Sequence, residues 1–312
     1  MIPAAFDYMA PRTLAELLNA LASGGEGTRP LAGGQSLIPM LKLRLGAADR
    51  LVDLGRIPDL RRIDAAGDPI VIGALATHAA IEDSRELEAA CPLLPAVARE
   101  IGDRQVRNRG TIGGSLVHAD PAADWPAAAL ALDAELVAAG GRTGAGAGVA
   151  GAAGAIGSAA RRAIPTAGFF TGLMSTALRP GELLLEMRIR CPGKGGAAYE
   201  KVRQSASGFA IAGIAVVLEY GPDRVCTRAR IGVTGVADRA YRATAAEQGL
   251  VGKRLEEATI AAAAARATDG VKDPMSDLHA GGEYRLHLAR VHCRRALARA
   301  AGLGGTPSAG RA

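Results

Sequence analysis

The chain has 312 residues, enough for two domains, and 49% of them are hydrophobic although only 3% are aromatic. Its formal net charge is +6, but the basic residues are spread along the chain without interleaved aromatics, which argues against a nucleic-acid partner. Its four cysteines have no CxxC spacing, which argues against a zinc knuckle or an iron–sulfur cluster and favours a reducing cytosol over a disulfide scaffold.

The first half of the chain predicts interspersed helices and strands. Its first residues lack the basic and apolar regions of a secretory signal. A capping box from Thr13 to Glu16 precedes leucines at helical spacing, which end at Gly24-Gly25. Strands are expected through Leu31, over 51–54, over 70–72 and before Gly113-Gly114, and helices over 92–101 and 125–132.

Residues 138–160 are rich in glycine and alanine and predict a flexible loop or insertion. The uncharged run 143–160 within them is too weakly hydrophobic for a membrane helix, so we expect a soluble protein. Because helices and strands do not strictly alternate, we predict an α+β fold. Structure should resume near Phe169, with strands over 183–189, 211–219 and 229–233, helices over 255–267 and 284–301, and a disordered tail over 302–312.

Two short motifs place a glycine pair before a serine, AGGQS at 32–36 and TIGGS at 111–115. Glycine pairs let backbone N–H groups approach a phosphate without a Cβ in the way. If Gly114 has a positive φ beside the phosphate, a Cβ at this position would be strained. Two such loops could hold the two phosphates of a dinucleotide, or both glycine pairs could simply form turns. Neither motif has the GxGxxG pattern of a Rossmann site or the GxSxG pattern of a nucleophile elbow.

Acidic residues follow the second motif. His118, Asp120 and Asp124 could be metal ligands, but a fourth ligand at metal-site spacing is missing. A better use for Asp124 beside a dinucleotide is to accept a hydrogen bond from a ribose hydroxyl. Because Asp124 immediately precedes a helical pattern, it could also be the helix N-cap.

These residues resemble a known family. The resemblance lies in AGGQSLIPMLKLRL (32–45), VRNRGTIGGSLVHADPAADWPAAALALDAEL (106–136), AYEKVRQSASGFAIAG (198–213), ARIGVTGV (229–236) and EYRLHLARVHCRRALA (283–298). These stretches are similar to the medium, FAD-binding subunits of aerobic carbon monoxide dehydrogenases, in the xanthine dehydrogenase family of molybdenum hydroxylases. The resemblance implies a vanillyl-alcohol-oxidase-type (PCMH-type) FAD-binding fold with two α/β subdomains over 1–177, and a smaller C-terminal α+β domain with an antiparallel sheet over 178–301.

The resemblance also implies one non-covalent FAD, since neither motif offers a His or Cys for covalent attachment. The glycine motifs would hold its pyrophosphate, and Ile101 would pack near the isoalloxazine. Tyr199 would lie near the flavin ring or be an ordinary half-buried strand tyrosine. Lys201 would stabilise negative charge on the reduced flavin. The residues expected to bind FAD are Ala32, Gly33, Gly34, Gln35, Ser36, Ile101, Thr111, Ile112, Gly113, Gly114, Ser115, Asp124, Leu184, Tyr199 and Lys201.

Three departures from the family leave this site in place. Residues 138–160 are longer and more repetitive than expected, and Gly168 stands where an acidic residue is usual. Gln35 replaces a common histidine but keeps a hydrogen-bonding side chain.

The resemblance implies an oxidoreductase subunit that transfers electrons and needs no catalytic acid or base. A large partner subunit would oxidise the substrate at a molybdenum cofactor, and a small one would relay electrons through [2Fe–2S] clusters to FAD and then to a quinone or another acceptor. The complex would be a cytoplasmic dimer of heterotrimers that can associate with the inner face of the membrane. Carbon monoxide is the leading substrate, and a related aldehyde or N-heterocycle dehydrogenase is the alternative. A stand-alone flavin reductase would need an NAD(P)H site, of which there is no signature, and intact glycines argue against a scaffold with a decayed FAD site.

Overall fold

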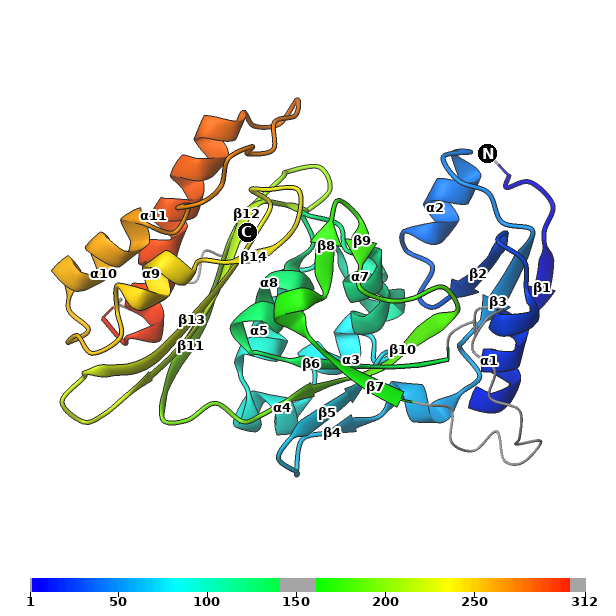
Figure 1. The fold of residues 1–312 in the computed structure, drawn as a ribbon, viewed down its shortest axis with the longest axis horizontal. Coiled ribbons are helices and arrows are strands. Elements are labelled where there is room, and N and C mark those ends of the chain that lie inside the picture. The colour runs from blue at the N-terminus through cyan, green and yellow to red at the C-terminus, as the bar shows by residue number, and fades with distance from the viewer. Residues whose placement is uncertain (1, 141–160, 304–312) are drawn as a thin grey trace, which may run out of the picture.

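The computed structural model describes residues 2–140 and 161–303, and its N-terminal part is a small parallel sheet with two helices (Figure 1). The first helix begins as predicted, because the Thr13 side chain accepts a hydrogen bond from the Glu16 N–H. The Glu16 carboxylate accepts from the N–H of Arg12, one residue before the cap. The elements are β1 (Asp7–Met9), α1 (Leu14–Ser23), β2 (Thr28–Leu31), α2 (Leu37–Lys42) and β3 (Arg50–Asp53), and the sheet order is β1-β3-β2.

A five-stranded antiparallel sheet and a group of short helices form the middle of the molecule. Their shared core contains Ile70 and Ile72 of the sheet and Leu116 and Trp125 of the helices. The strands, in spatial order, are β4 (Ile63–Asp64), β5 (Ile70–Gly73), β10 (Glu182–Ile189), β6 (Glu135–Gly140) and β7 (Arg161–Pro165). The helices are α3 (His78–Glu82), α4 (Arg85–Ala90), α5 (Leu93–Arg99), α6 (Arg104–Arg109), α7 (Ile112–His118) and α8 (Asp124–Ala131). A hairpin of β8 (Phe170–Gly172) and β9 (Ser175–Thr176) follows β7.

The C-terminal part is a four-stranded antiparallel sheet covered by helices on one face. Its strands, in order, are β11 (Gly195–Arg203), β12 (Ala210–Tyr220), β13 (Cys226–Thr234) and β14 (Tyr241–Arg242). The helices are α9 (Thr244–Gln248), α10 (Glu257–Ala265) and α11 (Gly282–Ala300). Along β12, Ile214 and Val216 lie in the core under these helices, whereas Ala215 and Val217 lie in the core of the middle part. The alternation of a strand therefore places both faces of this sheet in apolar surroundings.

Helix α8 joins the middle part to the C-terminal sheet by packing on β12 and β13. Gly232 of β13 makes the close approach possible, because a Cβ there would lie 2.0 Å from the carbonyl oxygen of Ala127. Just after α8, the Asp133 carboxylate pairs with Arg230 and Arg242 of the sheet. Close packing and the charge pairs of Asp133 thus attach the C-terminal sheet to the middle of the molecule.

The predicted α+β class is confirmed, but two local predictions change. The strand expected before Gly113-Gly114 is wrong, because α6 precedes that motif and both glycines lie in the first turn of α7. The loop predicted from residue 138 begins too early, since Ala138 and Ala139 pair with β10 inside β6. The rest of that loop, 141–160, and the tail from 304 lie outside the described residues.

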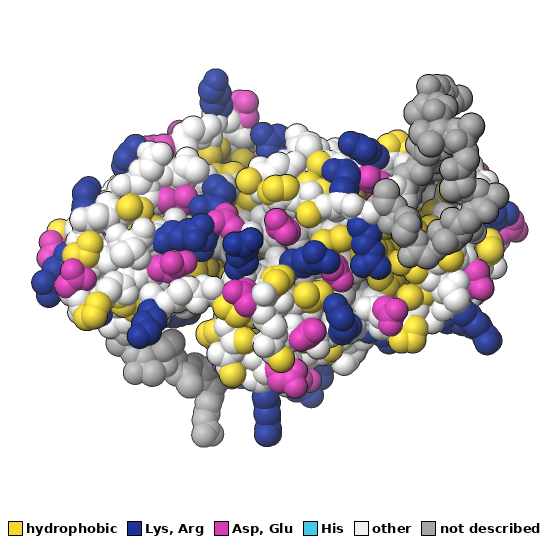
Figure 2. Space-filling model, turned by 60° about the horizontal axis from the view of Figure 1, so that its bottom comes forward, with side chains coloured by type: hydrophobic (Ala, Val, Ile, Leu, Met, Phe, Trp, Pro, Cys, Tyr) yellow, Lys and Arg dark blue, Asp and Glu magenta, His cyan; other side chains and the backbone are white. Residues whose placement is uncertain are grey.

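The predicted domain boundary at residue 178 stays a prediction, and the sheet topology favours a later one. Residue 178 was expected to begin the C-terminal domain, whereas β10 is the central strand of the middle sheet, between β5 and β6. We therefore propose that the C-terminal domain begins between β10 and β11. Within the described residues, no helix combines the length and the apolar composition that a membrane crossing requires. On the face shown in Figure 2, Lys and Arg side chains are interspersed with Asp and Glu rather than gathered into one basic area.

Candidate cofactor site

The fold brings the two glycine motifs together although they are far apart in the sequence. A Cβ on Gly33 would lie 2.1 Å from the carbonyl oxygen of Arg109 and 2.8 Å from the Cα of Gly110. A Cβ on Gly114 would lie 3.7 Å from the Cβ of Ala32. Only a residue without a side chain fits at Gly33, so glycine here lets the first motif contact the backbone directly before the second motif.

The first motif presents unpaired backbone donors. Gly34 has a φ of +75°, a conformation that glycine adopts without strain. In the part of the chain that the structure describes, the N–H groups of residues 33–36 have no hydrogen-bond acceptor. Ser36 stands at the N-cap of α2, yet its hydroxyl accepts no capping hydrogen bond. Successive unpaired N–H groups are suited to bind an anionic oxygen, as predicted for a phosphate-binding loop.

The second motif differs from its prediction, because it begins a helix and its N–H groups have partners. Ile112 and Gly113 donate to the carbonyls of Ala76 and Ala74, at 3.0 and 2.9 Å. Gly114 donates at 3.1 Å to the hydroxyl of Thr111, which is therefore a helix cap. Gly114 is helical and does not have the positive φ that the sequence left open.

Gly113 has a packing role, because a Cβ there would lie 2.5 Å from the Cβ of Ala74. Its backbone can approach Ala74 closely only without a side chain. The second motif thus supports the first one by close packing rather than by offering free N–H groups.

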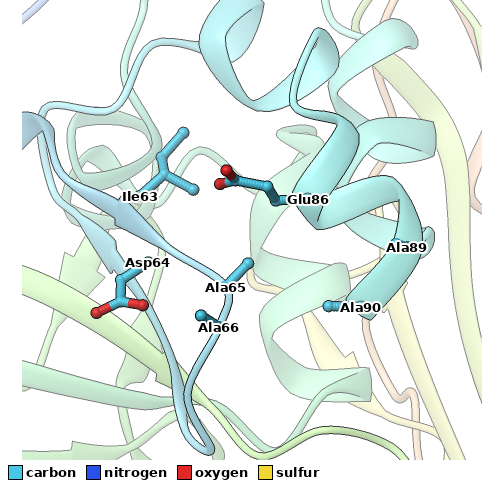
Figure 3. Close-up of a pocket in the computed structure, with 7 residues that line it drawn as sticks. All are labelled: Ile63, Asp64, Ala65, Ala66, Glu86, Ala89 and Ala90. Atoms are coloured by element: carbon cyan, nitrogen blue, oxygen red, sulfur yellow. The ribbon is translucent and has the colours of Figure 1, made fainter.

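Lys42 and Arg109 complete the surroundings of the first motif. Both are exposed and line a hollow of about 650 Å³ next to the motif. The other residues that line it are Gly33, Gly34, Gln35, Ile38, Pro39 and Leu43. A second hollow of about 580 Å³ lies between the β4–β5 turn and α4 (Figure 3). It is lined by Ile63, Asp64, Ala65, Ala66, Glu86, Ala89 and Ala90, so it contains two carboxylates and no basic side chain, which makes it unsuitable for a phosphate.

His78 supports the turn that leads into the second motif, a role that no sequence pattern predicted. The backbone N–H of His78 donates to the Gly110 carbonyl at 3.0 Å. Its imidazole Nδ1 accepts from the Trp125 indole N–H at 3.0 Å. Its Nε2 faces Gly110, where a Cβ would lie 2.7 Å away. Burial, together with the nearby charge of Arg107, lowers the pKa of His78 to about 4. A lone histidine among apolar residues has no spacing that would reveal this contact.

We predict that His78 makes stability depend on pH. Its pKa is about 4 in the folded chain and 6.5 when unperturbed, so between these values the unfolded chain binds a proton that the folded chain does not. Its contribution is complete above about pH 6.5 and is lost as the pH falls toward 4, by up to about 1.4 kcal/mol per pH unit. Urea unfolding of His78→Gln should show a shallower pH dependence in this window. His287→Gln, at an exposed histidine, should show the same pH dependence of unfolding free energy as the parent. Equal pH dependence for the parent and His78→Gln would contradict the prediction.

Asp124, Tyr199 and Lys201 form a buried cluster between α8 and β11. The Tyr199 hydroxyl donates to Asp124 Oδ1 at 2.5 Å. The Lys201 ammonium lies 2.8 and 2.9 Å from the two Asp124 oxygens and donates at 2.8 Å to the Glu100 carbonyl. The exposed fractions of the Lys201 and Asp124 side chains are 0% and 6%. Burial raises the pKa of Asp124, against the opposing effect of Lys201, and raises the pKa of Tyr199 well above its usual value.

This cluster changes the interpretation of Asp124. The N-cap of α8 is Ala123, and Asp124 is the first helical residue, so the predicted cap is wrong. Its carboxylate oxygens are already occupied by Tyr199 and Lys201, and the ribose contact stays a prediction. Tyr199 is buried rather than half-buried. Helix α8, which carries Asp124, packs against α7, which carries the second motif.

The remaining expected residues lie in the middle part. Leu184 of β10 and Ile112 of α7 are buried in its core. Ile101 packs against this core after α5, and Ser115 is half-buried on α7. Across residues 2–140 and 161–303, no three or more His, Cys, Asp or Glu side chains are grouped so that they could hold a metal ion.

Comparison with known proteins covers nearly the whole chain. Residues 4–146 match the family model "FAD binding domain in molybdopterin dehydrogenase", and residues 197–300 match "CO dehydrogenase flavoprotein C-terminal domain". The chain is 36% identical to the carbon monoxide dehydrogenase medium chain of Hydrogenophaga pseudoflava, over 95% of this chain and 97% of that one. It is also 36% identical to the 6-hydroxypseudooxynicotine dehydrogenase complex subunit alpha of Paenarthrobacter nicotinovorans, over 96% of both chains. The solved Cu,Mo-CO dehydrogenase in its cyanide-inactivated form contains a chain that superposes with a TM-score of 0.88 at 37% identity, covering 97% of this chain and all of that one.

Proposed function

The chain belongs to the family of FAD-binding medium subunits of molybdopterin dehydrogenases, and from this premise we propose that it is the electron-transferring subunit of a carbon monoxide dehydrogenase. The family makes it an oxidoreductase subunit whose cofactor is FAD. The substrate is our proposal, supported by the match to the CO dehydrogenase flavoprotein domain and by the relative from Hydrogenophaga pseudoflava.

The geometry of the first glycine motif carries the FAD assignment. Its unpaired N–H groups lie beside a hollow with two cationic side chains, which suits the diphosphate of a dinucleotide. Gly33, Gly34, Gln35 and Ser36 would hold that diphosphate, and Gly113 and Gly114 would keep the motif in place by packing. The flavin supplies the redox chemistry when bound, and the protein positions it.

The buried cluster is proposed to hold the flavin end of the site. Tyr199 keeps its proton, because burial and the neighbouring Asp124 raise its pKa. Lys201 is held by Asp124 and by the Glu100 carbonyl, and a cation so placed can stabilise negative charge on a nearby group. Ile101, Leu184, Thr111, Ile112 and Ser115 remain proposed contacts.

The partners are also part of the proposal. We expect a large subunit with the molybdenum cofactor and a small subunit with [2Fe–2S] clusters, assembled as a cytoplasmic dimer of heterotrimers that passes electrons to a quinone, at the inner face of the membrane. Relatives of this family that form dehydrogenase complexes support the assembly. The second candidate is the same role in an N-heterocycle or aldehyde dehydrogenase, which the equal identity to the 6-hydroxypseudooxynicotine dehydrogenase subunit favours.

We predict that the purified chain is yellow and holds one non-covalent FAD, and that its complex with the large and small subunits reduces this flavin when CO is added. Acid precipitation should release the flavin into the supernatant. Flavin that stays on the precipitated chain would contradict non-covalent binding.

NADH should not reduce the flavin of the isolated chain. Rapid reduction by NADH would favour a stand-alone flavin reductase instead. Reduction by an aldehyde or an N-heterocycle, but not by CO, would select the second candidate.

A further inference from the structure

The turn between α5 and α6 is held by cationic side chains. The carbonyl of Glu100 accepts a hydrogen bond from the Lys201 ammonium at 2.8 Å. The next two carbonyls, of Ile101 and Gly102, both accept from the Arg107 guanidinium, at 3.1 and 3.4 Å. Among the described residues, no backbone N–H donates to the carbonyl of Ile101 or Gly102. The shape of this turn, residues 100–102, therefore depends on two side chains from outside it.

Arg107 is itself fixed in place. Its side chain is 14% exposed, and its Nε donates to the carboxylate of Glu82 on α3 at 2.6 Å. All of α6 (104–109) lies in the described part of the chain, and none of its residues is buried, so apolar packing contributes little to holding this helix. The planar guanidinium presents several N–H donors in fixed directions, so one side chain can hold Glu82 and two carbonyls together. Arg107 thus ties the 100–102 turn to both α3 and α6.

The Arg107 contact also orients the peptide bond between Ile101 and Gly102. This bond is planar and trans, so its N–H points away from its carbonyl, which faces Arg107. Gly102 is exposed, and its φ of +42° lies in the left-handed region that favours glycine. Within residues 2–140 and 161–303, the Gly102 N–H has no hydrogen-bond acceptor. The turn therefore offers one free donor, and Arg107 determines its direction.

We propose that Arg107 is a positioning residue for the flavin, which it does not contact itself. By holding the 100–102 turn it would keep Ile101 and the free N–H of Gly102 against the isoalloxazine ring. It would also keep the Glu100 carbonyl where that carbonyl holds Lys201. This inference rests on the proposed FAD function, because it takes Ile101 and Lys201 to lie at the flavin end of the site. Loss of Arg107 removes two of the three side-chain hydrogen bonds to the carbonyls of the turn.

The test compares FAD with ADP on the full chain stripped of cofactor. Arg107→Gln should weaken FAD binding about tenfold or more, because the turn loses charge-assisted hydrogen bonds and no longer supports the ring. ADP lacks the isoalloxazine, so its affinity should stay near the parental value and the ratio of the two affinities should fall. Arg107→Lys should give a smaller loss, because lysine keeps the charge but not the planar fork.

The midpoint potential of the bound flavin is the second measurement. It should become more negative in Arg107→Gln, because a displaced Lys201 stabilises the negative charge of the reduced flavin less well. Arg99→Gln is the matched control. Arg99 directly precedes the turn and pairs with Glu88 at 2.8 Å, but both side chains are about half exposed. This variant should have the parental affinities and the parental potential.

Other outcomes overturn the inference. A lower melting temperature of Arg107→Gln with a parental ratio of FAD to ADP affinity and a parental potential would show that Arg107 only stabilises the fold. Equal weakening of FAD and ADP would place its effect at the diphosphate instead. If Arg107→Gln does not fold, Arg107→Lys decides, and parental values there would contradict the proposal. These results would leave the FAD function intact, whereas a parent chain that binds no FAD would refute the proposed function itself.

Discussion

Replacing Gly33 by alanine should lower FAD affinity by at least about two orders of magnitude and should also destabilise the chain without cofactor. The added Cβ would lie 2.1 Å from the carbonyl oxygen of Arg109, and this contact is with backbone, so no side-chain rotation can relieve it. The two motifs must therefore separate, which costs about 1–3 kcal/mol in overpacking alone and also moves the unpaired N–H groups away from the diphosphate. FAD titration and thermal melting of the FAD-free chain measure both effects.

Gly25→Ala is the matched control, because a Cβ there meets no atom within 4 Å. It should bind FAD and melt like the parent. Gly114→Ala should be intermediate, since its Cβ would lie 2.8 Å from the Thr111 hydroxyl oxygen, which caps α7 and can shift slightly. If Gly33→Ala binds FAD as tightly as Gly25→Ala, the glycine motif does not hold the diphosphate and the placement of the cofactor is wrong.

Asp124→Ala should strongly destabilise the chain. It leaves the Lys201 ammonium, whose side chain is 0% exposed, without its counter-charge. Breaking a buried pair in this way costs about 3–5 kcal/mol. For a protein of this size the melting temperature should fall by roughly 10 °C. Adding Lys201→Met should recover much of the loss, because the double variant buries no uncompensated charge.

An exposed pair with the same geometry is the control. Arg99 and Glu88 lie 2.8 Å apart, as do Lys201 and Asp124, but their side chains are about half exposed, at 49% and 50%. Glu88→Gln should therefore cost less than about 1 kcal/mol. Parental melting of Asp124→Ala would show that water reaches Lys201, and the cluster would then not be a dry link between α8 and β11.

Local sequence patterns predicted those features that depend on neighbours in the chain. Thr13 caps α1 as expected, because the acceptor and the donor are three residues apart. A strand was predicted over 211–219, where β12 lies, and its two faces follow from the alternation of a strand. The glycine motifs and the stretches around them indicated the family, which the comparisons confirm.

Only the tertiary structure decided the features that depend on distant partners. Glycines favour turns, so the second motif predicted a strand and a loop, but the carbonyls of Ala74 and Ala76 accept its N–H groups and stabilise a helix there. Strand β10 belongs to the middle sheet because its hydrogen bonds go to β5 and β6, which no local pattern reveals. Asp124 meets Lys201 across 77 positions, and Trp125 meets His78 across 47. Spacing rules describe a few residues along one element, whereas burial and pairing depend on which elements the whole chain brings together.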